Sequence, residues 1–146
     1  MRRDANKSPT GLSPARSTAT TIIEGSRTHD IQSFYDEVNR VFMADEDWQL
    51  GPSLDALNDL LYGGYGAMLG AETLDIVWRD IAHSREALGH EATRAYYLGK
   101  IAHPDRFDVA RFRRALTALD SGTGPTYFDL VMQIIAEHPN IRLIAE

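Results

Sequence analysis

The chain has 146 residues, a length that suits one domain, and its 43% hydrophobic and 25% charged residues are typical of a globular protein. It contains no cysteine, which excludes disulfide bonds and thiolate chemistry. No stretch approaches the roughly twenty apolar residues of a membrane span, and the basic N-terminus lacks the apolar segment of a secretory signal. We therefore expect a soluble, cytoplasmic protein.

The net charge of −6 is unevenly distributed along the chain. Residues 1–18 carry four bases and one acid, whereas residues 81–146 carry eight acids and eight bases. Residues 30–80 carry eleven acids and two arginines, a local net charge of −9. Nucleic-acid binding depends on lysine and arginine side chains that neutralise phosphates, so this segment disfavours a nucleic acid as the direct ligand. It favours a cationic protein as the partner.

Residues 1–18 are rich in Ser, Pro, Arg and Thr, and we expect them to form a disordered tail before the first predicted element. Residues 19–23 are rich in branched side chains and are followed by Gly25, which predicts a strand and a turn. Asp30 is a good N-cap for an amphipathic helix that ends near residue 42. The apolar face of this helix consists of Ile31, Phe34, Tyr35, Val38, Val41 and Phe42.

A predicted loop over residues 43–52 leads to a second helix, which Ser53 caps and which has to end at the glycine pair 63–64. Branched residues over 73–78 predict a second strand, and Asp80 is the expected N-cap of the short helix that follows. The remaining predicted elements are helices over 91–101 and 105–119, a linker over 121–125, a helix over 127–138 and a strand over 141–145.

Strands that alternate with helices imply parallel pairing. The predicted fold class is α/β: a small, three-layer-like domain in which helices pack a short three-stranded parallel sheet. Residues 19–146 form this single domain, and residues 89–123 are a helical insert before the last helix. The insert could be a charged pair of helices that lies over the sheet, a second interaction surface, or a helical segment that is simply exposed to solvent.

The second predicted helix has two different sides. At 100° per residue, Asp55 and Asp59 fall on one side, one turn or roughly 5–6 Å apart. Like charges at this spacing cost an isolated helix a few tenths of a kcal/mol, and the helix dipole offsets part of that cost at Asp55. Asn58 and Tyr62 share the acidic side. The opposite side carries four leucines, Leu54, Leu57, Leu60 and Leu61.

The preceding loop adds Asp45, Glu46 and Asp47, with the aromatic Trp48 beside them. A rim of acids next to an aromatic side chain and a rigid carboxylate pair suits the capture of arginine and lysine side chains. Most acidic helix faces are simply solvated, which is the alternative here. The excess of acids over residues 30–80 weighs against that alternative, but both interpretations stay open at this point.

The run from Gly51 to Asp59 has the spacing G-x-S-L-D-A-L-x-D and follows the first amphipathic helix. Together with Ile22, Ile23, Gly25 and Phe34, it resembles the barstar family of ribonuclease inhibitors. Weaker similarity returns over residues 74–80 and 127–145, whereas the tail and residues 89–123 match nothing in the family. The resemblance implies a small α/β domain with three parallel strands.

The resemblance also implies that the acidic helix and the loop before it plug the active site of a microbial ribonuclease. Asp59 takes the position of the family's principal carboxylate, which occupies the enzyme's phosphate site, and Asp55 takes the neighbouring acidic contact. The chain departs from the family at Gln49 and Asn58, where the family has aromatic residues, and near Gln133, where it has an acid. These departures bear on which ribonuclease is bound rather than on the mode of binding.

We therefore predict an inhibitor of a basic ribonuclease or ribonuclease-like toxin, with no cofactor, no metal and no catalysis. The sequence has no EF-hand spacing, no clustered histidines, no nucleophile elbow and no phosphate-binding glycine loop. The alternative is an interaction module of the same fold with a basic partner that is not a nuclease. The predicted partner-binding residues are Asp45, Asp47, Trp48, Gln49, Gly51, Asp55, Asn58, Asp59, Tyr62 and Gly63.

Overall fold

The computed structural model describes residues 17–146, so residues 1–16 of the predicted tail lie outside the described residues. The three strands are parallel and lie in the order β1-β2-β3, with Ile22 beside Val77 and Val77 beside Ile144. The predicted α/β class and three-stranded parallel sheet are confirmed. The elements are β1 (Thr18–Glu24), η1 (Gly25–Arg27), α1 (Ile31–Phe42), α2 (Leu54–Leu60), η2 (Gly66–Met68), β2 (Thr73–Arg79), α3 (Ile81–Ala87), α4 (His90–Ile101), α5 (Val109–Asp120), α6 (Tyr127–Ala136) and β3 (Ile141–Ala145).

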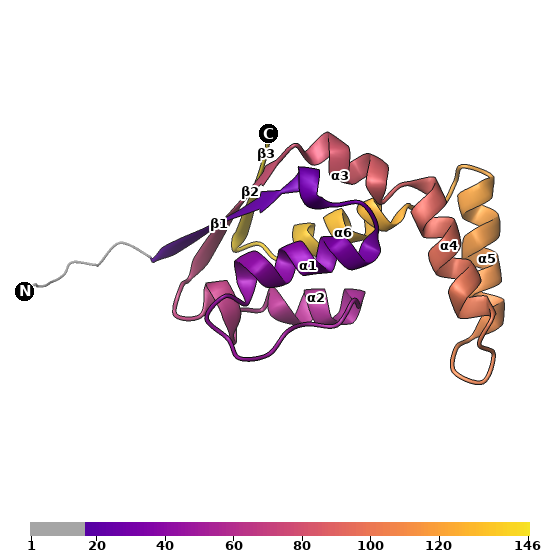
Figure 1. Cartoon of the computed structure of the whole chain (residues 1–146), viewed down its shortest axis with the longest axis horizontal. Coiled ribbons are helices and arrows are strands. Elements are labelled where there is room, and N and C mark those ends of the chain that lie inside the picture. Colours follow the sequence, from indigo (N-terminus) through magenta and orange to yellow (C-terminus); the bar gives the residue numbers. More distant parts are fainter. Residues whose placement is uncertain (1–16) are drawn as a thin grey trace, which may run out of the picture.

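The helices are arranged in layers against the sheet (Figure 1). Helix α1 contacts β1 and helix α6 contacts β3, whereas α2 contacts α6 and lies farther from the strands. Helices α4 and α5 form a hairpin that stands beside this body, at the end where α1 and α2 begin. This hairpin is the helical insert that the sequence predicted before the last helix.

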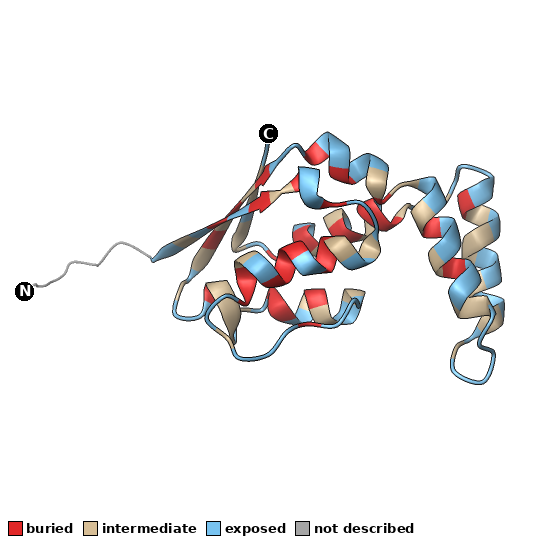
Figure 2. Ribbon diagram, viewed as in Figure 1, coloured by how far each residue is buried: buried red, intermediate tan, exposed pale blue. Residues whose placement is uncertain are grey.

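The core lies between the sheet and the helices (Figure 2). Alternate residues of β2 (Leu74, Ile76 and Trp78) are buried, as the period-2 geometry of a strand with one covered face requires. The Trp78 ring stacks on Phe34 of α1 with 5.8 Å between ring centroids, and its Nε1 donates a 3.0 Å hydrogen bond to Ser84 Oγ. The stacking joins the sheet to α1, and the hydrogen bond joins it to α3.

Two predicted features of the helices are corrected. Helix α2 ends at Leu60, because the chain turns immediately afterwards and reaches Gly63 with a φ of 88°, a left-handed conformation that glycine adopts at little cost. Asp80 precedes α3 but does not cap it with its side chain. Its φ of 52° is left-handed, which lets the chain pass from β2 to α3 through a single residue. Asp is among the few residues other than glycine that tolerate this conformation.

The predicted helix over 105–119 starts later than expected. Asp108 is its N-cap and accepts a 3.2 Å hydrogen bond from the Arg111 amide, so α5 begins at Val109. The side chain of Asp108 satisfies a backbone donor that would otherwise lack a partner in the first turn.

Candidate partner-binding surface

Helix α2 is fixed by its leucine side, as predicted. Leu57, Leu60 and Leu61 are buried, and Leu54 is partly buried against the same core. Ser53 caps the helix by accepting a 3.2 Å hydrogen bond from the Ala56 amide. Each fully buried leucine contributes about 1.5–3 kcal/mol, so this short helix is held by its packing and presents a rigid outer side.

The outer side of α2 carries two exposed carboxylates, Asp55 and Asp59. Asp59 Oδ2 accepts a 2.8 Å hydrogen bond from the Tyr65 hydroxyl. Burial and the nearby Asp59 carboxylate raise the pKa of Tyr65 to about 12, so this phenol stays a donor at neutral pH. The Tyr65 ring also lies 4.9 Å from the Trp48 ring, measured between centroids. Tyr65 therefore links the acidic helix to the loop before it.

The loop over residues 43–52 is held at two points. The Asn39 side chain donates to Leu50 O at 3.1 Å and accepts from Leu50 N at 2.8 Å, in a buried pair of hydrogen bonds. Glu46 accepts a 2.8 Å hydrogen bond from the Gly66 amide, so its carboxylate ties the loop to the body. Gly66 is required there, because a Cβ at this position would lie 2.9 Å from Phe42 O.

The remaining predicted residues of the loop are exposed to solvent. Asp45, Asp47, Gln49 and Gly51 are exposed, and 45% of the Trp48 surface is accessible. The predicted acidic rim is thus divided between two roles. Its two aspartates face solvent, whereas Glu46 between them has a structural contact.

Asn58 and Tyr62 differ from the expectation that they simply share the acidic side. Asn58 is half-buried, and its Oδ1 lies 2.8 Å from Nε2 of His138, which follows α6. His138 is only 5% exposed, so this hydrogen bond lies at the edge of the core. Tyr62 is 73% exposed and rests edge-on against the His138 ring, 4.7 Å between centroids. Asn58 therefore lies at the border of the surface, and Tyr62 projects from it.

Sequence reasoning missed Tyr65 and His138, for different reasons. Tyr65 belongs to the glycine-rich segment 63–66, whose sequence has no spacing that indicates a binding role. Residues six positions apart are not neighbours on a helix, so the sequence pattern does not predict the contact between Tyr65 and Asp59. The turn after α2 brings the two side chains together. His138 is 80 residues from Asn58, and no local pattern indicates their contact.

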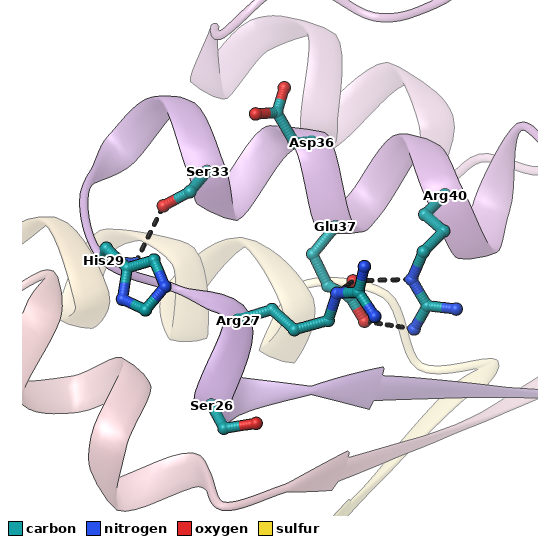
Figure 3. Close-up of a pocket in the computed structure, with 7 residues that line it drawn as sticks. All are labelled: Ser26, Arg27, His29, Ser33, Asp36, Glu37 and Arg40. Atoms are coloured by element: carbon teal, nitrogen blue, oxygen red, sulfur yellow. Dashed lines mark hydrogen bonds and ion pairs between the residues drawn. The ribbon is translucent and has the colours of Figure 1, made fainter.

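A second charged cluster lies where β1 ends beside α1 (Figure 3). The Glu37 side chain is 1% exposed and accepts hydrogen bonds from Arg40 at 2.8 and 2.6 Å and from the Glu24 amide at 2.8 Å. Arg27 Nε adds an ion pair at 3.3 Å. Figure 3 shows that both guanidinium groups converge on Glu37, whereas Asp36 points away from them.

The cluster around Glu37 has a structural role. Burial raises the pKa of the Glu37 carboxyl, but the hydrogen bonds from Arg40 and the Glu24 amide, with the two positive charges, lower it overall. The carboxylate is therefore charged and paired inside the protein. It fastens α1 to the end of β1 and leaves no unpaired carboxylate for a partner.

The acids of the described residues do not gather into a metal site. Over the described range 17–146, no group of three or more His, Asp or Glu residues is arranged to hold a metal ion. In the same range, no helix has both the length and the apolar character that crossing a membrane requires.

Comparison with protein families adds independent information. A family model described as Barstar (barnase inhibitor) matches residues 18–100. This range is more than half of the chain, and it contains the loop, α2 and all the predicted partner-binding residues. No curated protein matches the chain. The match includes nearly all of α4, so the expectation that residues 89–123 match nothing in the family is wrong for residues 89–100. Residues 101–146, which include α5 and α6, lie outside the match.

Proposed function

Because this chain belongs to the barstar family, whose members are inhibitors rather than enzymes, we propose that it binds a basic microbial ribonuclease and blocks its active site. The observation that carries the proposal is the rigid carboxylate pair on α2. Asp55 and Asp59 are exposed on a helix that three buried leucines hold in place, and Tyr65 fixes one oxygen of Asp59.

The blocking group in this mechanism is the Asp59 carboxylate. A ribonuclease binds phosphate with arginine and lysine side chains, and a carboxylate accepts the same paired, charge-assisted hydrogen bonds. Within residues 17–146 no hydrogen bond reaches Oδ1 of Asp59, and Oδ2 retains accepting capacity beyond its bond from Tyr65. The side chain thus imitates a phosphate group while α2 fills the space of the substrate. Asp55 supplies the neighbouring contact one turn away.

The residues around this pair complete the proposed interface. Trp48, before α2 in the chain, and Tyr62, after it, offer exposed aromatic surface, and aromatic side chains are enriched among the strongest contacts of interfaces. Asp45 and Asp47 lie on the rim, where charge mainly accelerates encounter. The proposed interface also includes four residues that contribute backbone or lie at its border: Gln49, Gly51, Asn58 and Gly63.

The charge distribution supports fast, salt-sensitive association. The net charge of −9 over residues 30–80 attracts a basic protein over a distance that salt shortens to about 8–10 Å at physiological ionic strength. The protein acts in the cytoplasm as a cofactor-free, non-catalytic inhibitor. There it keeps an endogenous ribonuclease silent or provides immunity against a related toxin.

A second candidate is an interaction module of the same fold with a basic partner that is not a nuclease. The neutral residues Gln49, Asn58 and Gln133, at positions where the family has aromatic or acidic residues, favour it. One simple observation distinguishes the two candidate functions. The first requires a basic ribonuclease-like protein made by the same cell, and a gene for it beside that of this chain is the expected arrangement.

Inhibition assays test the proposed function. Purified barnase and other basic ribonucleases of its kind are titrated with the wild-type protein and with Asp59→Ala at low and high salt. We expect inhibition of at least one enzyme, weakened by salt and lost most in Asp59→Ala. Tight binding to a basic protein without any inhibition of ribonuclease activity would favour the second candidate.

A further inference from the structure

An apolar groove lies between the insert and the start of α1, with a cavity volume of about 550 Å³. Its polar margins are Asp30 on the α1 side and Lys100 on the α4 side. Its apolar walls consist of Ile31, Pro52, Ala92, Ala95, Tyr96 and Phe107. The volume falls within the range of roughly 300–1,000 Å³ that ligand-binding clefts have, so it admits a large side chain.

The groove is continuous with the acidic surface. Pro52 in its wall directly precedes Ser53, the cap of α2. Figure 1 shows that α1 and α2 both begin at the end of the body where α4 stands. Burial and the neighbouring Tyr97 raise the pKa of the Tyr96 phenol, and the Arg111 charge lowers it in part. A protein that covers the start of α2 therefore lies beside the groove, because Pro52 belongs to both.

The groove also has an unused hydrogen-bonding group. The Tyr96 ring packs edge-on against Tyr127, 5.1 Å between centroids, which holds it in place. Among residues 17–146, its hydroxyl has no hydrogen-bond partner. Lys100 Nζ lies 4.1 Å from the Phe107 ring centroid and 5.2 Å from that of Tyr96, so the ammonium group makes cation–π contacts with both rings. The groove thus offers apolar walls and one free phenol.

We propose that this groove receives an aromatic or long aliphatic side chain of the same basic ribonuclease that binds α2, and so helps to select the target. This inference rests on the proposed function. The two charged residues that line the groove, Asp30 and Lys100, have opposite signs, so its apolar walls select an apolar side chain, and the neighbouring acidic α2 attracts the basic protein that carries it. Phe107 lies outside the matched range 18–100, so the groove is completed by a part of the chain that can differ from other family members.

Gly99 allows a direct test, because it lines the groove and a Cβ there would meet nothing within 4 Å. Gly99→Trp fills the groove from the exposed side of α4, and Gly99→Ala is the matched control. Glycine is unfavourable inside a helix by roughly 1 kcal/mol relative to alanine, so the control should be at least as stable as the wild type. Ala95→Gln, also at an exposed groove position, serves if Gly99→Trp does not fold.

The measurement is the inhibition constant of each variant against barnase and other basic ribonucleases of its kind, with Asp59→Ala in parallel. We expect Gly99→Trp to weaken inhibition about tenfold or more, the scale of one lost interface contact, and Gly99→Ala to change it less than about twofold. Wild-type inhibition in Gly99→Trp, together with lost inhibition in Asp59→Ala, overturns the groove proposal and leaves the proposed function standing. If the wild-type protein inhibits none of the enzymes, both proposals fail.

The alternative occupant of the groove is a second copy of this chain, and analytical ultracentrifugation tests for it. A dimer of the wild-type protein that Gly99→Trp dissociates would overturn the assignment of the groove to a ribonuclease. A wild-type protein whose mass in solution does not depend on Gly99 supports it.

Discussion

Tyr65 donates a 2.8 Å hydrogen bond to Asp59 across the turn that follows α2. This contact restricts the side chain on which the proposed mechanism depends most. Preorganisation of this kind improves affinity because less conformational freedom is lost on binding. Tyr65 also contacts Trp48, so the acidic helix and the acidic loop are held as one surface.

Tyr65→Phe should therefore weaken binding to the target ribonuclease. The change removes one charge-assisted hydrogen bond and keeps the ring against Trp48, so we expect about a three- to tenfold rise in Kd, mainly through faster dissociation. Surface plasmon resonance separates the two rate constants. Tyr97→Phe, in the insert, is the control. A tighter complex in Tyr65→Phe would show that Tyr65 competes with the partner for Asp59.

Asn58→Ala should reduce stability more than binding. The substitution leaves the buried His138 ring nitrogen without its 2.8 Å partner, and an unsatisfied buried polar group costs about 1–3 kcal/mol. Urea denaturation measures the change in the free energy of unfolding. A large loss of affinity with unchanged stability would show instead that Asn58 contacts the partner directly.

Glu37→Gln should destabilise the protein at neutral pH and hardly at all in acid. The folded carboxyl has a pKa below its ordinary value of 4.5, so its stabilising contribution is complete above that value and is lost as pH falls through the folded pKa. We expect a loss of about 1–2 kcal/mol at pH 7, less than for a fully buried pair because both arginines are partly exposed. Denaturation curves from pH 7 to pH 3 test this, with the exposed Asp36→Asn as control. A constant difference across this range would contradict the assignment.

The hydroxyl groups of Tyr35 and Tyr127 form a buried 2.8 Å hydrogen bond between α1 and α6. Tyr35→Phe and Tyr127→Phe should each cost about 1–2 kcal/mol, because each leaves one buried hydroxyl without a partner. The double variant should cost clearly less than the sum, since no polar group is then left unpaired. A double-mutant cycle by urea denaturation measures the coupling. Additive effects would mean that water satisfies the remaining hydroxyl.

The predicted parts of the surface are those that depend on local periodicity. Helical spacing was enough to place Asp55 and Asp59 together and the leucines behind them, because both sets lie within two turns of one helix. The parallel sheet followed from strands that alternate with helices. The barstar resemblance is confirmed by the family match over residues 18–100.

The unpredicted parts depend on contacts between distant segments or on turn geometry. Glu46 resembles Asp45 and Asp47 in the sequence, yet only Glu46 reaches the Gly66 amide. The groove needs the start of α1, Pro52 and α4 in one place, which no single stretch of sequence encodes. Asp80 is a good capping residue by type, but the abrupt passage from β2 to α3 imposes a left-handed backbone on it instead.

The most direct test of the central claim is the affinity of the double variant Asp55→Asn, Asp59→Asn for an inhibited ribonuclease, measured by isothermal titration calorimetry. Glu86→Gln, Glu137→Gln removes the same charge from exposed positions outside the proposed surface and is the matched control. We predict a loss of affinity of about a hundredfold or more in the first variant, because two charge-assisted contacts of about 1.5–3 kcal/mol each are removed. The control should bind within about threefold of the wild type, since distant exposed charges are largely screened. Equal affinities for the wild type and the Asp55, Asp59 variant would contradict the account.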